Sequence, residues 1–183
     1  MNVKKLIKLI RVIPILIGSK WKDPLILKDL QRWKDIKSIQ EPDIVALSMI
    51  MWDYPEFRNL YIYRNSKHLI YRMWVKLWYR PMDTLYIDAK EIGGGLFIQH
   101  GFATMIAAER IGENCWINQQ VTIGYRNQGK PPIIEDNVTI TCGAKVLGDI
   151  TIGYGATIGA NAVVVRDVEP GAVMVGIPAR RIK

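Results

Sequence analysis

Aliphatic residues in the second half of the chain recur with a step of six residues. The residue that leads each repeat stands at Ile92, Ile98, Ile111, Ile117, Ile123, Ile134, Ile140, Val146, Ile152, Ile158 and Val164. Six residues form one short strand and a turn, and about three such units close a triangular coil. The step therefore predicts a parallel β-helix. A β-sandwich or an α/β domain rich in Ile and Val would not keep it over so many repeats.

Two further positions of the repeat hold small residues. Glycine follows the lead residue at Gly93, Gly112, Gly124, Gly153 and Gly159. We expect these glycines to bend the chain with a positive φ. Four positions after the lead stand Cys115, Val121, Val138, Ala144, Ala156 and Ala162. We expect them to fill the narrow corners of the coil interior, which gives Cys115 a packing role.

The step of six is broken twice. Ile111 follows Ile98 by a step of thirteen instead of twelve, and this first interruption contains His100. Ile134 follows Ile123 by a step of eleven, and residues 125–132 of this second interruption (YRNQGKPP) predict a loop.

The first part of the chain has helical periodicity instead. Apolar spacing predicts helices near Val3–Leu16, Pro24–Ile36, Asp43–Met51 and Ser66–Trp78, with a break at residues 53–55. The predicted fold class is thus mainly β. It consists of an α-helical segment over residues 1–82 and a β-helix over residues 83–183.

Charge is distributed unevenly between these two segments. Residues 1–82 hold 16 basic and 7 acidic side chains, whereas residues 83–183 hold 9 and 10. A solvated helical surface is the ordinary explanation, and attraction to an anionic membrane surface or an acidic polymer is the sharper one. No nucleic-acid-binding motif is present, so we expect no nucleic-acid partner.

Cysteine and histidine are too few for a metal site of the usual kind. Cys115 and Cys142 lie far apart in the sequence, and only His68 and His100 accompany them, so we expect no metal and two reduced thiols in a cytoplasmic protein. The apolar N-terminus is interrupted by charges, is too short to span a bilayer and lacks a small-residue cleavage site. At most, we expect peripheral association with the inner face of the membrane.

Several stretches of the repeat region resemble a known family. They are IGGGLFIQHGFATMI (92–106), INQQVTIG (117–124), CGAKVLGDITIGYGATIGANAVVVRDV (142–168) and VGIPARRI (175–182). They are similar to the left-handed parallel β-helix acyltransferases, in particular to the serine O-acetyltransferase-like group that includes acetyltransferases of polysaccharide-biosynthesis clusters. The resemblance implies a homotrimer or a dimer of trimers, with active sites between subunits and acetyl-CoA as donor.

The resemblance also implies a catalytic residue. His100 matches the family's catalytic histidine, which would take the proton of the acceptor hydroxyl so that the oxygen attacks acetyl-CoA directly. The family keeps an aspartate about fifteen residues upstream to orient the imidazole, but Leu85 stands there in this chain. Asp88 and Asp83 are the nearest substitutes, and we assign the role to Asp88, although either residue could simply form a turn.

Two departures from the family pattern concern the acceptor. Gln99 replaces the aspartate that precedes the catalytic histidine in serine acetyltransferases, and Pro131 replaces a second serine-contacting histidine. The main hypothesis is therefore acetyl transfer to a neutral sugar hydroxyl in surface polysaccharide biosynthesis, with Gln99, Tyr125 and Arg126 contacting the sugar. The alternatives are a serine O-acetyltransferase of cysteine biosynthesis and a non-catalytic trimeric scaffold.

Candidates for binding CoA follow from the same match. Small residues that would let the pantetheine arm lie close to the backbone are Gly124, Ala144, Gly159 and Ala162. Cations available for the phosphates are Lys145, Arg180 and Lys183.

Overall fold

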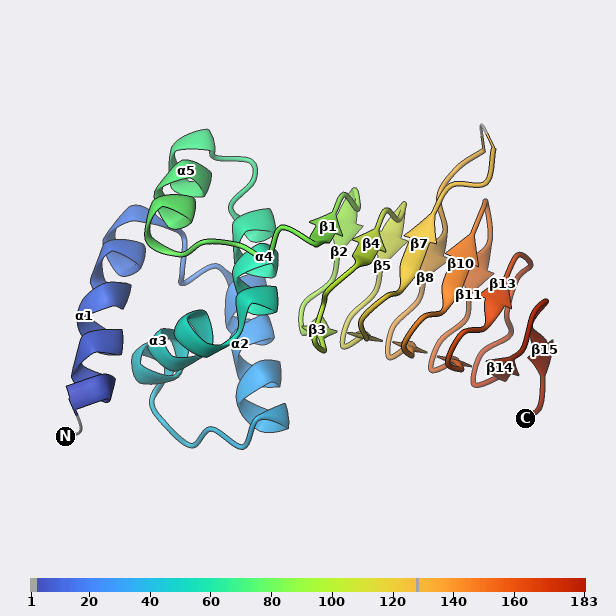
Figure 1. The fold of residues 1–183 in the computed structure, drawn as a ribbon, viewed down its shortest axis with the longest axis horizontal. Helices are drawn as coiled ribbons and strands as arrows, with labels where there is room; N and C mark the ends of the chain where they lie inside the picture. Colours follow the sequence, from blue (N-terminus) through green and yellow to red (C-terminus); the bar gives the residue numbers. More distant parts are fainter. Residues whose placement is uncertain (1–2, 128) are drawn as a thin grey trace. The chain divides into compact units, whose positions relative to one another are not determined.

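The structure, a computed structural model, describes residues 3–127 and 129–183. The chain divides into two compact units, Met1–Met82 and Asp83–Lys183 (Figure 1). The first unit is helical and the second is built from short strands, and each is described by itself.

The helical unit contains five helices in its described residues. They are α1 (Val3–Gly18), α2 (Pro24–Ile36), α3 (Asp43–Asp53), α4 (Pro55–Arg64) and α5 (Leu69–Trp78). Four of them match predicted helices, with ends that differ by up to three residues. α4 was not predicted, because its aromatic residues obscure the helical period, but it begins at the predicted break. Asp23 caps α2 by accepting a hydrogen bond from the Leu25 N–H at 2.9 Å.

Aromatic rings and one ion pair hold α2 and α4 together. The Trp33 ring meets the Phe57 ring edge to face, with 5.2 Å between centroids, and both are at most 1% exposed. Beside them the Arg64 guanidinium donates to the Asp29 carboxylate at 2.8 Å. Both of these charged side chains are at least 96% buried, so each depends on the other for compensation.

The second unit is a parallel β-helix with three faces. The first face stacks β1 (Leu85–Ile87), β4 (Thr104–Ile106), β7 (Thr122–Gly124), β10 (Lys145–Leu147) and β13 (Val163–Val164). The second stacks β2 (Glu91–Ile92), β5 (Arg110–Ile111), β8 (Ile133–Ile134) and β11 (Thr151–Ile152). The third stacks β3 (Phe97–Ile98), β6 (Trp116–Ile117), β9 (Thr139–Ile140), β12 (Thr157–Ile158), β14 (Val173–Val175) and β15 (Arg180–Arg181).

The interior of the β-helix is formed by the predicted lead residues. All of them are at most 3% exposed, and they stack in register, as Ile111 does on Ile92 and on Ile134. Cys115 and the other small residues four positions after a lead are buried as predicted. Burial raises the pKa of the Cys115 thiol to about 11.

The expected role of the glycines that follow the leads is wrong. None of them has a positive φ; in the regular repeats that conformation falls two residues later, at positions such as Gly95 and Asn114. At Gly93 a Cβ would instead lie 2.7 Å from the backbone carbon of Gly112 in the next coil. Glycine is needed there because the coils approach closely.

The two interruptions have different structures. Ile106 is the lead residue hidden in the first one, and it follows Ile98 by eight residues and precedes Ile111 by five. The extra residues form the corner before β4, which carries His100. The second interruption is a loop that leaves from β7 and projects beyond the stacked coils (Figure 1).

The C-terminal segment turns back over the last coil. β15 pairs antiparallel with β14, whereas every other strand pair in the described residues is parallel. Val163 of β13 donates its N–H to the Gly176 carbonyl at 3.0 Å and accepts from the Ala179 N–H at 2.9 Å. The C-terminal segment therefore takes up hydrogen-bonding groups on the outer side of β13, in the first face, and of β14, in the third face.

Candidate active site

His100 lies on a corner whose backbone has an unusual conformation. His100, Gly101 and Ala103 have φ values of 65°, 52° and 52°, and the Phe102 N–H donates to the His100 carbonyl at 2.6 Å. A positive φ is uncommon for residues other than glycine, and such strain concentrates at functional sites. The turn leaves the imidazole exposed outside the coil, where an acceptor can reach it.

The Gln99 side chain lies between His100 and an indole that the sequence analysis did not single out. The Trp116 Nε1–H donates to Gln99 Oε1 at 3.2 Å, and Gln99 Nε2 lies 3.5 Å from His100 Nε2. Because indole N–H can only donate, it fixes the oxygen of the amide toward Trp116 and the NH2 group toward the imidazole. The signal for Trp116 was its register opposite Phe97, on which its ring packs.

Asp88 is not brought together with His100. It follows the C-terminal end of β1, where its N–H donates to the Ile106 carbonyl and its carboxylate accepts from the Tyr86 hydroxyl at 3.5 Å. The His100 corner meets the other end of β1, where the Thr104 N–H bonds to the Thr84 carbonyl at 3.1 Å. Asp88 and His100 thus lie at opposite ends of the first face. Leu85, at the position of the family aspartate, is buried.

Tyr125 and Arg126 also stand at the end of the first face remote from His100. They follow β7, and both side chains are exposed at the start of the loop. The base of the loop is anchored, because Pro131 and Pro132 are buried and the Pro132 carbonyl accepts from the Glu109 N–H at 2.9 Å. Within one chain these two side chains and His100 do not form a single site.

The residues predicted to bind CoA differ in what they offer to a ligand. Ala144 and Ala162 are fully buried, and both backbone polar groups of Ala144 are hydrogen-bonded within the coils. Gly124 has open space where a Cβ would stand, whereas a Cβ on Gly159 would lie 2.8 Å from Val175. The Lys145 ammonium donates to the Gln120 carbonyl at 2.6 Å. Gly124 is therefore the small residue most able to lie against a ligand.

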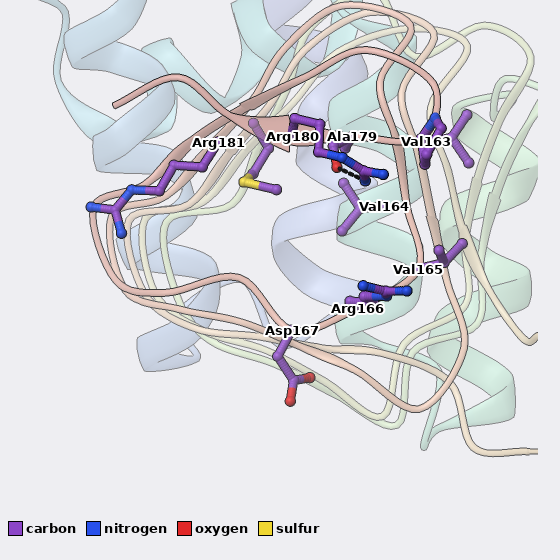
Figure 2. A pocket seen from close by; sticks show the side chains of 10 residues that line it. Val163, Val164, Val165, Arg166, Asp167, Ala179, Arg180 and Arg181 are labelled. Atoms are coloured by element: carbon purple, nitrogen blue, oxygen red, sulfur yellow. Dashed lines mark hydrogen bonds between the residues drawn. The ribbon is translucent and has the colours of Figure 1, made fainter.

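A pocket of about 390 Å³ lies at the last coil (Figure 2). The corner that carries His100 belongs to the opposite end of the stack of coils. Its lining residues are Val163, Val164, Val165, Arg166, Asp167, Met174, Pro178, Ala179, Arg180 and Arg181. Arg180 was predicted as a phosphate ligand, but Lys183 does not line the pocket. Arg166 was missed, because it follows the last regular repeat and no spacing rule applies there. Guanidinium groups suit phosphate oxygens, and Arg166 and Arg180 offer them here beside the Asp167 carboxylate, whereas Arg181 is paired with Glu169.

No side-chain cluster suited to a metal ion exists in the described part of the chain. Within residues 3–127 and 129–183, no three His, Cys, Asp or Glu side chains gather in a metal-binding arrangement. The chemistry considered below uses only the protein's own side chains and the acyl donor.

Several known proteins similar to this chain are serine acetyltransferases. A serine acetyltransferase of Staphylococcus xylosus is 47% identical over 97 residues, covering 51% of this chain and 45% of that protein. Another, of Synechococcus elongatus, is 36% identical over 162 residues, covering 81% of this chain and 66% of that protein. The chain thus spans about half to two thirds of the length of these curated relatives. No family model matches the chain.

A solved structure shows the same fold. The crystal structure of Neisseria gonorrhoeae serine acetyltransferase in complex with serine matches with a TM-score of 0.67 at 24% identity, over 98% of this chain and 74% of that chain. This likeness confirms the predicted left-handed parallel β-helix with a helical N-terminal segment. Together with the sequence relatives, it shows that the chain belongs to the hexapeptide-repeat acyltransferases, in the serine O-acetyltransferase branch.

Proposed function

We propose that this protein is an acetyl-CoA-dependent O-acetyltransferase in which His100 is the general base. The observation that carries the proposal is the strained, exposed corner that presents the only histidine of the β-helix unit. The imidazole takes the proton of the acceptor hydroxyl while the oxygen attacks the thioester carbonyl. The tetrahedral intermediate then collapses, the C–S bond breaks, and the imidazolium returns its proton to the CoA thiolate.

The active unit we propose is a homotrimer with sites between chains. Asp88, Tyr125 and Arg126 stand at one end of the first face and His100 at the other, so one chain does not assemble them. A neighbouring copy could place its Tyr125 corner against the His100 corner of the first. Trimers and dimers of trimers both satisfy this requirement.

The comparisons favour serine as the acceptor, because the relatives and the structural neighbour described above are serine acetyltransferases. The second candidate acceptor is a neutral sugar hydroxyl, and one specific observation favours it. The Gln99 amide, held by Trp116, carries no charge to pair with an α-ammonium group. The sugar hypothesis of the sequence analysis thus rests on Gln99 and Pro131 and has no support from the relatives.

The acceptor is tested by measuring CoA release from acetyl-CoA with L-serine and, separately, with nucleotide sugars and oligosaccharides. Robust turnover of serine alone supports the serine acetyltransferase and removes the sugar hypothesis. The reverse result supports the sugar acceptor that the uncharged Gln99 side chain favours. If the protein did not bind acetyl-CoA at all, the result would favour the non-catalytic scaffold over an enzyme.

The role of His100 is tested by His100→Ala. Loss of the general base should lower kcat by about 10²- to 10⁴-fold while acetyl-CoA still binds. His68→Ala is the matched control, because it removes the only other histidine, which is exposed in the helical unit. Equal turnover by wild type and His100→Ala would disprove the mechanism.

We propose a cytoplasmic location with peripheral membrane contact. Both cysteines are unpaired, as a reducing compartment requires. None of the helices in the described ranges has the length and apolar character needed to cross a bilayer. We propose that any membrane contact is made through a surface of the folded chain.

A further inference from the structure

Two helices of the first unit turn their apolar stripes toward solvent. On α1 the exposed apolar side chains are 42–80% exposed, and they are Val3, Leu6, Ile7, Ile10, Ile13 and Ile17. On α5 they are 36–77% exposed, and they are Leu69, Ile70, Met73, Trp74, Leu77 and Trp78. Their spacing places each set on one side of its helix. In a globular protein such a stripe normally faces the core.

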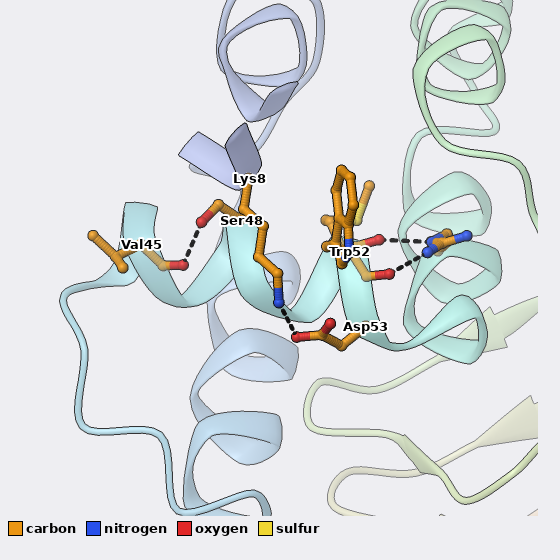
Figure 3. A network of polar contacts seen from close by, with 7 residues as sticks. Lys8, Val45, Ser48, Trp52 and Asp53 are labelled. Carbon is orange, nitrogen blue, oxygen red and sulfur yellow. Dashed lines mark hydrogen bonds and ion pairs between the residues drawn. The ribbon is translucent and has the colours of Figure 1, made fainter. Parts of the chain in front are cut away.

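The orientation of α1 is fixed by its basic residues, which bond inward. Lys8 reaches α3 and pairs with Asp53 at 2.5 Å (Figure 3), and Lys5 pairs with Glu41 at 2.7 Å. Only Val12 and Ile15 of this helix are buried. The helix is therefore held to the rest of the unit by these ion pairs and by a narrow buried side, and its larger apolar stripe remains exposed.

The two stripes belong to one surface. The Trp74 indole N–H of α5 donates to the Pro14 carbonyl of α1 at 2.7 Å, and the Arg11 guanidinium of α1 donates to the Trp78 carbonyl at 2.8 Å. Gly18 lies directly under the Trp74 ring, where a Cβ would be 2.3 Å away. We call the twelve exposed apolar side chains of these adjacent helices the α1–α5 face.

The charged side chains of the segments that form the α1–α5 face are all basic. All seven acidic residues of the helical unit lie between Asp23 and Glu56. The segments that form the face, residues 1–22 and 57–82, contain six basic residues each and no acidic ones. Lys67, which precedes α5, and Lys76, which lies on α5, are exposed. These two segments thus carry only positive charge of their own, although Lys5 and Lys8 are paired with Glu41 and Asp53 of the neighbouring part of the unit.

We propose that the α1–α5 face docks the protein on an anionic lipid bilayer. Apolar side chains would enter the boundary between headgroups and acyl chains, and the basic side chains would meet lipid phosphates. Trp74 and Trp78 fit the same depth, because indole combines an apolar ring with a polar N–H. A second copy is the poorer occupant, since face-to-face packing would bring like charges together. This inference does not depend on the acetyl acceptor.

Cosedimentation of the full chain with lipid vesicles tests the proposal. At about 0.1 M salt the protein should partition at least about tenfold more strongly onto vesicles containing about one third phosphatidylglycerol than onto pure phosphatidylcholine. Ile70→Glu/Leu77→Glu should weaken that partition by about tenfold or more. Ile17→Glu tests the other helix, α1. Because the Ile17 side chain is 80% exposed, this substitution should not disturb the core of the helical unit.

Ile182→Glu is the matched control, because Ile182 is 67% exposed in the second unit and should keep wild-type vesicle binding. Circular dichroism checks that each variant keeps its helices. Failure of wild type to bind anionic vesicles would overturn the proposal, as would wild-type binding by both the double variant and Ile17→Glu. A third result would also overturn it. If the double variant formed smaller oligomers than wild type in the absence of lipid, the face would be a contact between copies of the chain.

Discussion

The hydrogen bond between Trp116 and Gln99 gives the His100 corner a side-chain support that the sequence did not reveal. Trp116→Phe keeps an aromatic ring against Phe97 but removes the indole N–H, so the Gln99 amide becomes free to rotate. Losing one such hydrogen bond should lower kcat by about three- to tenfold. The KM for acetyl-CoA should not change. Steady-state kinetics measure both constants, and an unchanged kcat would show that Gln99 does not position the imidazole.

Cys115 predicts a stability change at alkaline pH. Its pKa rises from an ordinary 9.0 to about 11 because burial disfavours the thiolate. The folded state therefore holds the proton more tightly than the unfolded state. The resulting stabilisation is complete below pH 9 and is lost as the pH rises toward 11.

Urea unfolding at neutral pH and at about pH 10.5 measures this effect. Wild type should lose about 2 kcal/mol more of its free energy of unfolding over that range than Cys115→Ala. Cys142→Ala, at a half-buried cysteine, controls for loss of a thiol and should behave as wild type. Identical pH dependence in wild type and Cys115→Ala would contradict the assignment.

At the scale of elements, α2 and α4 depend on the buried pair Asp29–Arg64. Asp29→Ala leaves the guanidinium without its carboxylate in a site that water does not reach, which should lower the free energy of unfolding by about 3–5 kcal/mol. Glu41→Ala removes the more exposed partner of Lys5 and should cost at most about 1 kcal/mol. Chemical denaturation of both variants compares them, and similar losses would mean that the buried pair adds nothing special.

The sequence predicted elements well where a period repeats and poorly where it breaks. The lead residues were found because each inward position recurs every six residues and faces the same interior. Ile106 escaped because the corner before it holds extra residues and the next step is short. α4 escaped because aromatic rings on several sides of a short helix leave no apolar stripe.

Within the candidate site, the sequence could single out a residue only where its type is rare and its chemical role is specific. His100 could be singled out because it is the only histidine of the β-helix unit, and histidine is the side chain that most often serves as a general base. Asp88 could not be judged, because distance along the sequence does not tell at which end of a strand a side chain lies. The binding of Lys145 to the Gln120 carbonyl and the contribution of Arg166 to the pocket depend on contacts between coils, which no linear spacing encodes.

At the scale of the whole molecule, the separation of His100 from Tyr125 and Arg126 predicts an assembly. Light scattering after gel filtration should give a mass about three times the 20.9 kDa of one chain, or six times for a dimer of trimers. Full turnover by a monomeric form would show that a single chain is sufficient. Mixing an inactive His100→Ala chain with an inactive Tyr125 variant gives a second test. If each site combines His100 of one chain with Tyr125 of its neighbour, mixed oligomers should recover part of the activity. If each site lies within one chain, mixing should restore none.

The turn that closes the last coil also determines how this fold can fail. A β-helix grows by adding one coil to the strands of the previous one, and an uncovered final coil would offer the same template to another molecule. Here Gly176, Ala179 and β15 occupy the outward hydrogen bonds of β13 and β14, and Arg180 and Arg181 add charge at that rim. The closing turn thus works as a terminator of polymerisation. A chain that lost it would keep its inner coils intact and tend to form filaments.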